Sequence, residues 1–232
     1  MIGTLYGVGI GPGDPELITF KAARIIQQCP ILAIPQTGDS RRVALSIASQ
    51  AIADLEQKEI LSLPFPMTKN QEELDRNRDR IAGLITAKLL AGHDIAFLTL
   101  GDPTVYSTYW YIHQRILAQN LSAEMIPGVP SFCAVAAKLN LALAEADQPI
   151  HILPASYPST EAALSQPGTK VLMKMGKQLE PVKKMLKTKG LYHRAKMVQN
   201  CGFEQELVCH NLDDSGNSSS YFSIIIVKEE TS

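Results

Sequence analysis

The sequence predicts an α/β fold, with a mainly parallel sheet in the first half of the chain and a mixed sheet in the second. Apolar runs alternate with helix-period segments as far as residue 126. Two of these runs end in loops rich in glycine, aspartate and proline, at residues 7–15 and 101–106. After residue 195, short strand-like runs follow one another through turn-rich segments. Strands separated by helices imply right-handed crossovers and parallel pairing.

The first half is expected to alternate strand and helix from its first residues. Strands are expected at residues 3–9, 31–35, 60–63, 94–100 and 123–126, and helices at 15–28, 42–53, 71–91 and 106–119. The first helix has a clear start, because Asp14 can cap it and Pro15 suits the first helical position. The third helix carries apolar residues at helical spacing from Leu74 to Leu89, and Gly92 is placed to end it.

The segment 127–130, Pro-Gly-Val-Pro, interrupts this pattern, and we expect a first domain of residues 1–126 and a second of residues 127–232. In the second domain, helices are expected at 131–138 and 179–189, and strands at 150–154, 170–175, 196–199, 206–211 and 221–227. The loop 213–220 has the aspartate, serine, glycine and asparagine content of a hairpin turn.

Composition excludes several classes of protein. The 232 residues are 45% hydrophobic and 19% charged, which is ordinary for a globular domain. A formal net charge of −1 gives no general attraction to nucleic acid or to anionic membranes. No apolar stretch approaches the ~20 residues of a membrane span, and no export signal precedes the first strand. We therefore expect a cytoplasmic protein without nucleic-acid or membrane partners.

Cysteine and histidine spacing gives no sign of a metal site. Cys29, Cys133, Cys201 and Cys209 form no CxxC pair, and the five histidines never stand four residues apart. Buried or unreactive thiols in a reducing compartment are the expected state of the cysteines. We predict no metal held by the protein.

The first loop is a poor match to a dinucleotide-binding fingerprint. Gly7 and Gly9 have the required spacing, but Pro12 replaces the third glycine and removes an N–H that a phosphate would use. The second strand also ends in Gln36 instead of an acidic residue. A glycine-rich turn without a ligand would explain one such loop but not two.

The second loop suits a cationic ligand. Gly101 permits close approach of a backbone, and Pro103 stiffens the turn. Asp102 offers an acceptor for a sulfonium or an α-amino group, and a plain helix cap is the alternative interpretation. Because loops at the carboxyl ends of parallel strands share one edge of the sheet, the two loops can face one small molecule.

Three motifs taken together resemble the tetrapyrrole methylases: GVGIGPGDP at residues 7–15, GDPTVYST at 101–108 and PGVPS at 127–131. The resemblance covers essentially the whole chain, and residues 63–67 and 101–108 are most similar to the precorrin-2 C20-methyltransferases of cobalamin synthesis. It implies a two-domain class III S-adenosylmethionine-dependent methyltransferase with its cofactor in a cleft between the domains. A homodimer and an anionic tetrapyrrole substrate, methylated at C20 as precorrin-2 or cobalt-factor II, are also implied.

The resemblance also implies roles for particular residues. Pro12 would line the floor of the cleft, and Gly101, Asp102, Val105 and Tyr106 would hold the methionine portion of the cofactor, mostly through backbone groups. Pro130 and Ser131 match the loop after Pro-Gly, Met175 matches a methionine near the adenosine, and Asn200 and Cys201 fall where backbone contacts to adenine are expected. Tyr106 or Asp102 would assist loss of the proton from C20, with solvent as the alternative.

Two further features have competing interpretations. The segment 170–196 is rich in lysine and has Glu180 as its one acidic residue. A solvated helix face is favoured for Lys183, Lys184 and Lys187, but such cations can also steer an anionic tetrapyrrole. The aromatic residues Tyr106, Tyr109, Trp110 and Tyr111 are expected to pack in the core more often than to stack on a macrocycle.

Alternative functions remain open on the sequence alone. One keeps the fold and changes the acceptor to another tetrapyrrole carbon, or to protein or ribosomal RNA, although the neutral charge balance disfavours RNA. The other is a non-catalytic module that binds a nucleoside-like ligand.

Overall fold

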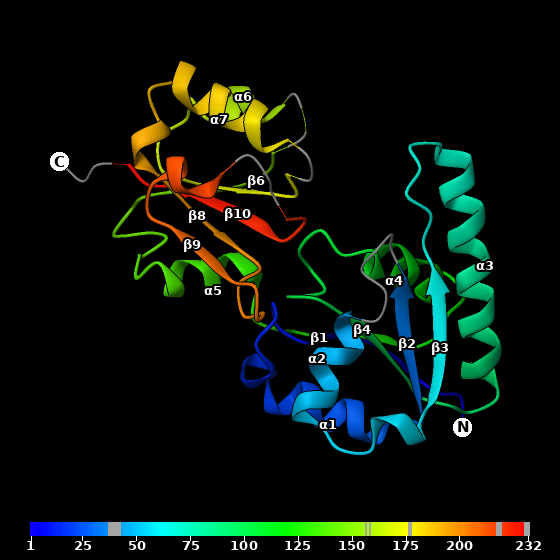
Figure 1. Cartoon of the computed structure of the whole chain (residues 1–232). Coiled ribbons are helices and arrows are strands. Elements are labelled where there is room, and N and C mark those ends of the chain that lie inside the picture. The colour runs from blue at the N-terminus through cyan, green and yellow to red at the C-terminus, as the bar shows by residue number, and fades with distance from the viewer. Residues whose placement is uncertain (37–42, 156, 158, 176–177, 217–219, 230–232) are drawn as a thin grey trace. The chain divides into compact units, whose positions relative to one another are not determined.

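A computed structural model describes residues 1–232 except 37–42, 156, 158, 176–177, 217–219 and 230–232 (Figure 1). The chain forms two compact units, Met1–Pro130 and Ser131–Ser232. The sequence-based boundary, after residue 126, lies just before the loop that ends the first unit.

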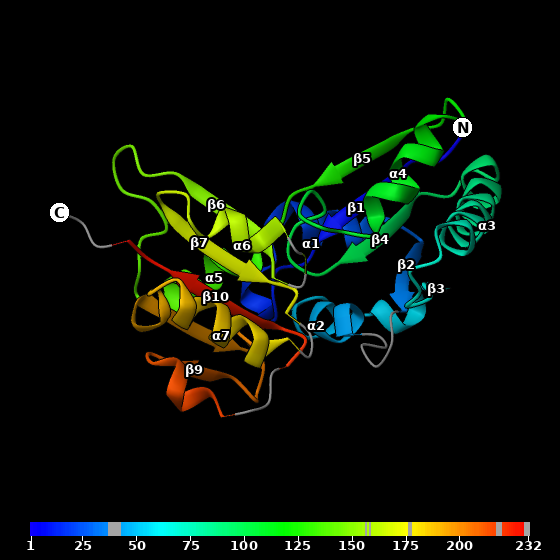
Figure 2. The same ribbon diagram turned by 90° about the horizontal axis from the view of Figure 1, so that it is seen from above.

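The first unit contains a five-stranded parallel sheet with helices on both faces. Its strands are β1 (Leu5–Gly9), β2 (Ile31–Gln36), β3 (Glu59–Pro64), β4 (Ile95–Thr99) and β5 (Ala123–Ile126), in the order β3-β2-β4-β1-β5. Its helices are α1 (Phe20–Gln28), α2 (Val43–Ala51), α3 (Gln71–Leu90) and α4 (Tyr109–Leu117). Figure 2 shows α4 and α2 on opposite sides of the sheet. This confirms the expected parallel α/β half.

The order of strands places a topological switch point between β4 and β1. The connection after β1 leads past β4 to β2, whereas the connection after β4 leads past β1 to β5. Connections that leave two neighbouring strands in opposite directions define the switch point at which open α/β sheets bind ligands. Because Gly9 is in register with Thr99, the loops that follow these strands start side by side.

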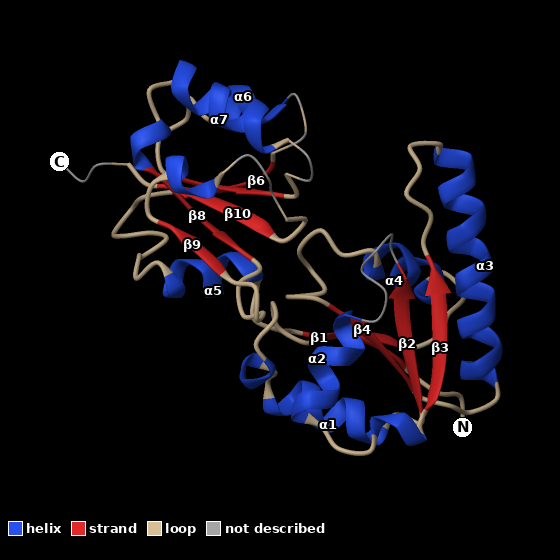
Figure 3. Cartoon of the chain, viewed as in Figure 1, coloured by secondary structure: helices blue, strands red, loops and turns tan. Residues whose placement is uncertain are grey.

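The second unit contains a mixed sheet in the order β6-β7-β10-β8-β9 (Figure 3). Its strands are β6 (Ile150–Pro154), β7 (Thr169–Met173), β8 (Ala195–Gln199), β9 (Leu207–Cys209) and β10 (Ser223–Val227), and its helices are α5 (Ser131–Lys138), α6 (Ser159–Ala163) and α7 (Leu179–Thr188). β6 and β7 are parallel, and the other pairs are antiparallel. Apolar residues of α7, including Val182 and Leu186, pack with Met197 and Ile225 of the sheet in one core.

The structure corrects three of the expected elements. The first helix is interrupted, because Asp14 caps a 3-10 turn at Pro15–Leu17 and Thr19 then caps α1 through a bond from the Ala22 amide. The fourth helix begins at Tyr109, three residues later than expected, after Tyr106 in a left-handed conformation. The loop 213–220 joins no hairpin, because β9 and β10 lie on opposite sides of β8; residues 217–219 of this loop are outside the described part.

None of the helices in the described residues has the length and hydropathy needed to cross a membrane.

Candidate functional site

The loops after β1, β4 and β5 meet backbone to backbone at the carboxyl edge of the first sheet. The Ile10 amide donates to the Thr99 carbonyl at 3.1 Å, and the Gly101 amide donates to the Gly11 carbonyl at 2.8 Å. A Cβ atom on Gly9 would lie 2.6 Å from the Gly101 oxygen and 2.7 Å from the Gly128 nitrogen. Only glycine therefore fits at this position, and the distant loops at residues 7–15 and 101–106 do come together as the sequence predicts.

Asp102 joins the second loop to the third. Its side chain is only 7% exposed. Oδ1 accepts hydrogen bonds from the amide and the hydroxyl of Thr104, and Oδ2 accepts one from the Gly128 amide at 2.9 Å. The alternative interpretation of Asp102 as a helix cap is wrong, because α4 begins only at Tyr109 and its N-cap position is Thr108. The carboxylate is instead held by donors from the loops themselves.

Tyr106 lies in the left-handed region with φ of 49° and is 43% exposed. Desolvation raises the pKa of its phenol above the ordinary value. The next residue, Ser107, bonds through Oγ to Thr99 Oγ1 at 2.8 Å and accepts from the Tyr109 amide at 3.1 Å. Tyr106 is therefore set between a buried carboxylate and a pair of hydroxyl groups.

Tyr109 anchors α4 beneath these loops. It is fully buried, which confirms core packing for this member of the aromatic group. Its hydroxyl donates to the Glu124 carbonyl at 2.9 Å and lies 3.0 Å from His113 Nδ1. Its ring occupies the space that a side chain at Gly7 would need. Trp110 stacks on His113 and remains about half exposed.

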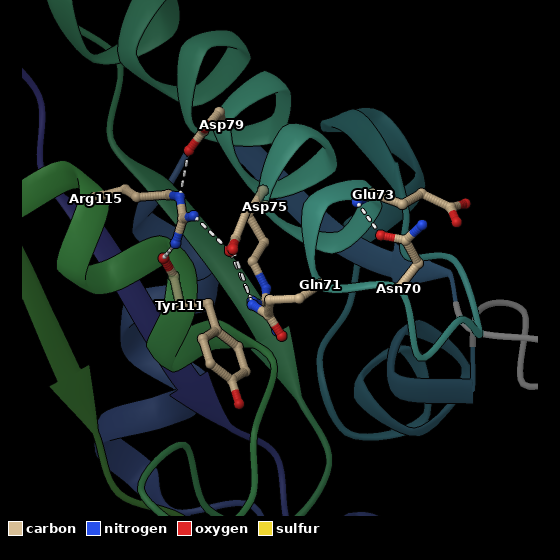
Figure 4. A network of polar contacts seen from close by, with 8 residues as sticks. Asn70, Gln71, Glu73, Asp75, Asp79, Tyr111 and Arg115 are labelled. Atoms are coloured by element: carbon tan, nitrogen blue, oxygen red, sulfur yellow. Dashed lines mark hydrogen bonds and ion pairs between the residues drawn. The ribbon is translucent and has the colours of Figure 1, made fainter.

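Ion pairs fix α4 against α3 (Figure 4). Arg115 Nε contacts Asp79 Oδ1 at 2.7 Å, and its terminal nitrogen contacts Asp75 Oδ1 at 3.1 Å. A hydrogen bond from Gln71, together with those from Arg78 and Arg115, lowers the pKa of Asp75. The Arg78 guanidinium also lies 3.7 Å above the Tyr111 ring. The helix that follows the second loop is thus fixed at both its buried and its exposed face.

The remaining candidate residue of the first unit, Pro12, is buried directly after Gly11, the residue that pairs with Gly101. Gly101 is buried as well, and Val105 is half-buried. The structure therefore gathers Pro12, Gly101, Asp102, Val105 and Tyr106 in the connected loops of one sheet edge.

The other candidates lie in or next to the second unit. Pro130 ends the first unit, and Ser131 begins α5. Met175 is fully buried and packs in the core of the second unit with Leu172 and Leu179. Residues 176–177, which follow it, are outside the described part of the chain.

Asn200 and Cys201 occupy the turn after β8. Asn200 has φ of 50°, its Nδ2 donates to the Gln205 carbonyl at 3.1 Å, and its Oδ1 accepts a bond from the Ser220 hydroxyl. Cys201 is only 7% exposed. Both side chains are engaged within the protein, and a role of these two residues through backbone groups stays a prediction.

Glu206 is a residue of this region that the sequence analysis missed. Its Oε2 accepts a bond from the Gly202 amide at 2.9 Å, and its Oε1 pairs with Lys138 of α5 at 3.0 Å. Burial alone would raise the pKa of Glu206, but the bonds from Gly202, Lys138 and Cys201 bring it below the ordinary value. No sequence signal could have found this residue, because its cationic partner belongs to a helix far away in the chain.

The lysine-rich segment is mostly engaged in contacts within the second unit. Lys183 is 8% exposed and bonds to the Gly216 carbonyl at 2.7 Å, so a solvated helix face is the wrong interpretation for this residue. Lys170 is buried and pairs with Glu229 at 3.2 Å. Lys187 lies 4.4 Å above the Tyr192 ring. These three lysines therefore stabilise the second unit through contacts within it.

No metal site is found among the described residues, where no group of three or more histidine, cysteine, aspartate or glutamate side chains could hold an ion. Three of the four cysteines are buried, and burial raises the pKa of the Cys29 thiol to about 12. Cys133 is a free cysteine on the surface, so of the two expected states, buried or unreactive, the buried one does not apply to it.

A family model described as Tetrapyrrole (Corrin/Porphyrin) Methylases matches residues 4–214 of the chain. The protein belongs to the tetrapyrrole methylase family. It is 34% identical to the cobalt-precorrin-2 C(20)-methyltransferase of Salmonella typhimurium, over 99% of this chain and 98% of the relative. It is 30% identical to a probable cobalt-precorrin-2 C(20)-methyltransferase of Methanocaldococcus jannaschii, over 98% of this chain and 97% of the relative.

Solved structures show the same fold for this tetrapyrrole methylase. A cobalt precorrin-4 methyltransferase superposes with a TM-score of 0.76 at 21% identity, over 97% of this chain and 94% of the other. A uroporphyrin-III C-methyl transferase of Thermus thermophilus, solved with S-adenyl homocysteine, superposes with a TM-score of 0.69 at 22% identity, over 98% of each chain. The two-domain methylase fold expected from the sequence is confirmed.

Proposed function

We propose that this tetrapyrrole methylase transfers the methyl group of S-adenosylmethionine to C20 of precorrin-2, or of its cobalt form cobalt-factor II, in cobalamin biosynthesis. The observation that carries the proposal is the extent of similarity. Relatives named for the C20 reaction align over 97–99% of the chain at 28–34% identity. Relatives named as precorrin-4 C(11)-methyltransferases align over 59–60% of it.

The residues of the second loop fit such a cofactor. S-adenosylmethionine supplies an electrophilic methyl group on a positively charged sulfonium. The glycines bring the backbone of three loops together at one edge of the sheet, with no Cβ atom on Gly9 or Gly128 to fill that space. The Asp102 carboxylate places a negative charge within these loops and is held there by Thr104 and Gly128. A sulfonium beside this loop would be stabilised by that charge.

Methyl transfer demands positioning more than it demands a strong base. The reaction is an in-line displacement, so the two reacting atoms must be held at near-attack distance. Gly101, Asp102, Val105 and Tyr106 would hold the methionine portion, and Pro12 would line the floor. Met175 would pack near the adenosine, and Asn200 and Cys201 would contact adenine through backbone groups. Pro130 and Ser131 match the loop after Pro-Gly. These assignments come from the family resemblance and belong to the proposal.

Tyr106 is proposed to act on the acceptor as a hydrogen-bond donor. Desolvation raises the pKa of its phenol, so the phenol keeps its proton at neutral pH and is a poor general base. Both oxygens of Asp102 already accept bonds from the loops. This favours solvent as the acceptor of the proton that leaves C20, with Asp102 as the alternative.

The decisive experiment incubates the protein with S-adenosylmethionine and, separately, with precorrin-2 and cobalt-factor II, and locates the added carbon by mass spectrometry and NMR. We expect one new methyl group at C20 of at least one acceptor. A methyl group at another carbon would favour a different tetrapyrrole methylation. Calorimetric binding of S-adenosylhomocysteine without any methyl transfer would favour a nucleoside-binding module, and preferential binding of NAD would contradict a methylase.

Two glycine variants give a matched pair for this assay. Gly9→Ala adds a Cβ that meets the Gly101 oxygen and the Gly128 nitrogen, and a small misplacement of the reacting groups costs up to about 100-fold in rate. Gly83→Ala on α3 adds the same atom with nothing within 4 Å. We expect Gly9→Ala to lose methylation and Gly83→Ala to retain it. Equal activity of the two variants would argue against these loops as the site.

The homodimer that the family resemblance implies and the cytoplasmic location expected from the sequence are part of the same proposal. Light scattering after size exclusion should give about twice the 25.4 kDa of one chain. A mass of one chain at micromolar concentration would contradict the dimer.

A further inference from the structure

The loop between β4 and α4 carries an unusual backbone conformation. Tyr106 is a bulky residue with a Cβ atom, and yet its φ is 49°. For such residues the left-handed region is unfavourable, and the conformation persists only where the surroundings impose it. The contacts on either side of Tyr106 therefore identify what imposes it.

On the C-terminal side of Tyr106, the hydroxyl group of Ser107 holds the two ends of the loop together. Ser107 Oγ lies 2.8 Å from Oγ1 of Thr99, the last residue of β4. The same Oγ accepts a hydrogen bond from the amide of Tyr109, the first residue of α4. Thr99 is buried. A single side chain thus connects the end of the strand to the start of the helix.

On the N-terminal side of Tyr106, the Asp102 carboxylate fixes the first residues of the loop. It accepts bonds from Thr104 and Gly128, and the Val105 amide donates to the Asp102 carbonyl at 3.3 Å. Only Val105 and Tyr106 lie between the two fixed points. The backbone of these two residues has to connect Thr104 to Ser107, both of which are held by hydrogen bonds. This constraint accounts for the left-handed conformation of Tyr106.

We propose that Ser107 and Thr99 form a positioning pair for the methyl donor. Their hydroxyl–hydroxyl bond presets the turn at Tyr106, so that residues 101–106 bind S-adenosylmethionine without first rearranging. The proposal rests on the proposed function, because it takes the second loop as the cofactor loop. A loop held in its bound conformation before binding avoids the ordering cost that otherwise weakens affinity. Neither hydroxyl group has to touch the ligand.

The test measures binding of S-adenosylhomocysteine to the full chain by calorimetry. Ser107→Ala removes the shared hydroxyl and should raise Kd about tenfold, since the strained turn is no longer imposed. Thr108→Ala is the matched control, because Thr108 is the neighbouring residue and makes no side-chain capping bond; its Kd should stay unchanged. Ser107→Thr keeps a hydroxyl group and should restore most of the affinity.

Thr99→Val tests the other half of the pair and serves if Ser107→Ala does not fold. It keeps the side-chain shape but has no hydroxyl group, so its Kd should rise by a similar factor. Both changes break the bond between the two hydroxyl groups, and Ser107→Ala also removes the acceptor of the Tyr109 amide. The double variant should therefore bind about as weakly as Ser107→Ala alone. In turnover, KM for S-adenosylmethionine should rise while kcat at saturation stays near that of the wild type.

The possible failures are distinguishable. If the unmodified protein binds no S-adenosylhomocysteine, the proposed function fails and this inference fails with it. If the unmodified protein binds and Ser107→Ala binds equally well, only the positioning pair is overturned. Additive losses for Ser107→Ala and Thr99→Val, or a lower melting temperature at unchanged Kd, would likewise overturn it and leave the proposed function standing.

Discussion

The carboxylate of Asp102 accepts hydrogen bonds from its own loop and from the Gly128 amide, and no atom larger than hydrogen fits on Gly9 or Gly128. At the scale of single residues, the site thus depends on glycines that let the backbones of three loops come close and on a carboxylate that joins two of these loops. The sequence suggested Asp102 as an acceptor for a cationic ligand. Its partner Gly128 belongs to a different loop, so its structural role could not be inferred from the residues around it.

Tyr106 gives a prediction at the same scale. Tyr106→Phe should lower kcat by roughly tenfold, which corresponds to the loss of one hydrogen bond worth about 1.4 kcal/mol in the transition state, because the phenol is exposed, protonated at neutral pH and part of the second loop. Methyl transfer at saturating S-adenosylmethionine is the measurement. Tyr111→Phe, which keeps the ring beneath Arg78, is the control and should turn over normally. An unchanged kcat for Tyr106→Phe would remove the hydroxyl from the chemistry.

At the scale of elements, the position of β4 between β2 and β1 decides where a ligand can bind. The sequence predicts both strands and both loops, because each depends on a local pattern of apolar residues, glycine and proline. It does not predict that β4 and β1 are neighbours in register from Leu5 with Ile95 to Gly9 with Thr99. That pairing is what turns two separate loops into one candidate site.

Helix α3 offers a test of element stability. Gly83 lies on its exposed face, and a Cβ added there meets nothing within 4 Å. Gly83→Ala should stabilise the protein by about 0.5–1 kcal/mol, because alanine loses less conformational freedom on folding into a helix. Chemical denaturation gives the free energy of unfolding.

Gly190→Ala is the control for this change. Its Cβ also meets nothing, but φ at this position is 69°. An alanine there should destabilise the protein by roughly 1 kcal/mol, since the left-handed region disfavours a Cβ atom. A stabilising effect at both positions would mean that the gain at Gly83 does not come from the helix.

At the scale of the whole molecule, each unit has a hydrophobic core of its own. The first core joins β1, β2 and β4 to α3 and α4, and the second joins β7, β8 and β10 to α7. The chain passes once from the first unit to the second, at Pro130 and Ser131. Both units therefore have the internal packing that cooperative unfolding requires.

We expect two transitions in urea for this reason. The single tryptophan, Trp110, belongs to α4 and reports on the first unit, whereas far-ultraviolet circular dichroism reports on both units. Curves from the two probes should not coincide, since a protein with two separate cores departs from two-state behaviour. Superimposable curves with one midpoint would show instead that the units unfold together.

The amino-acid sequence alone predicts the α/β class, the parallel first half, the mixed second half and the loops that form the candidate site. These features depend on apolar periodicity and on glycine and proline, which act through neighbours in the chain. The order of the strands, the placement of β9 and β10 on opposite sides of β8 and the burial of Lys183 follow only from tertiary contacts. The same holds for the bonds between the Gly128 amide and Asp102, between Ser107 and Thr99, and between Lys138 and Glu206. Each of these depends on residues far apart in the chain, which only folding brings within reach of one another.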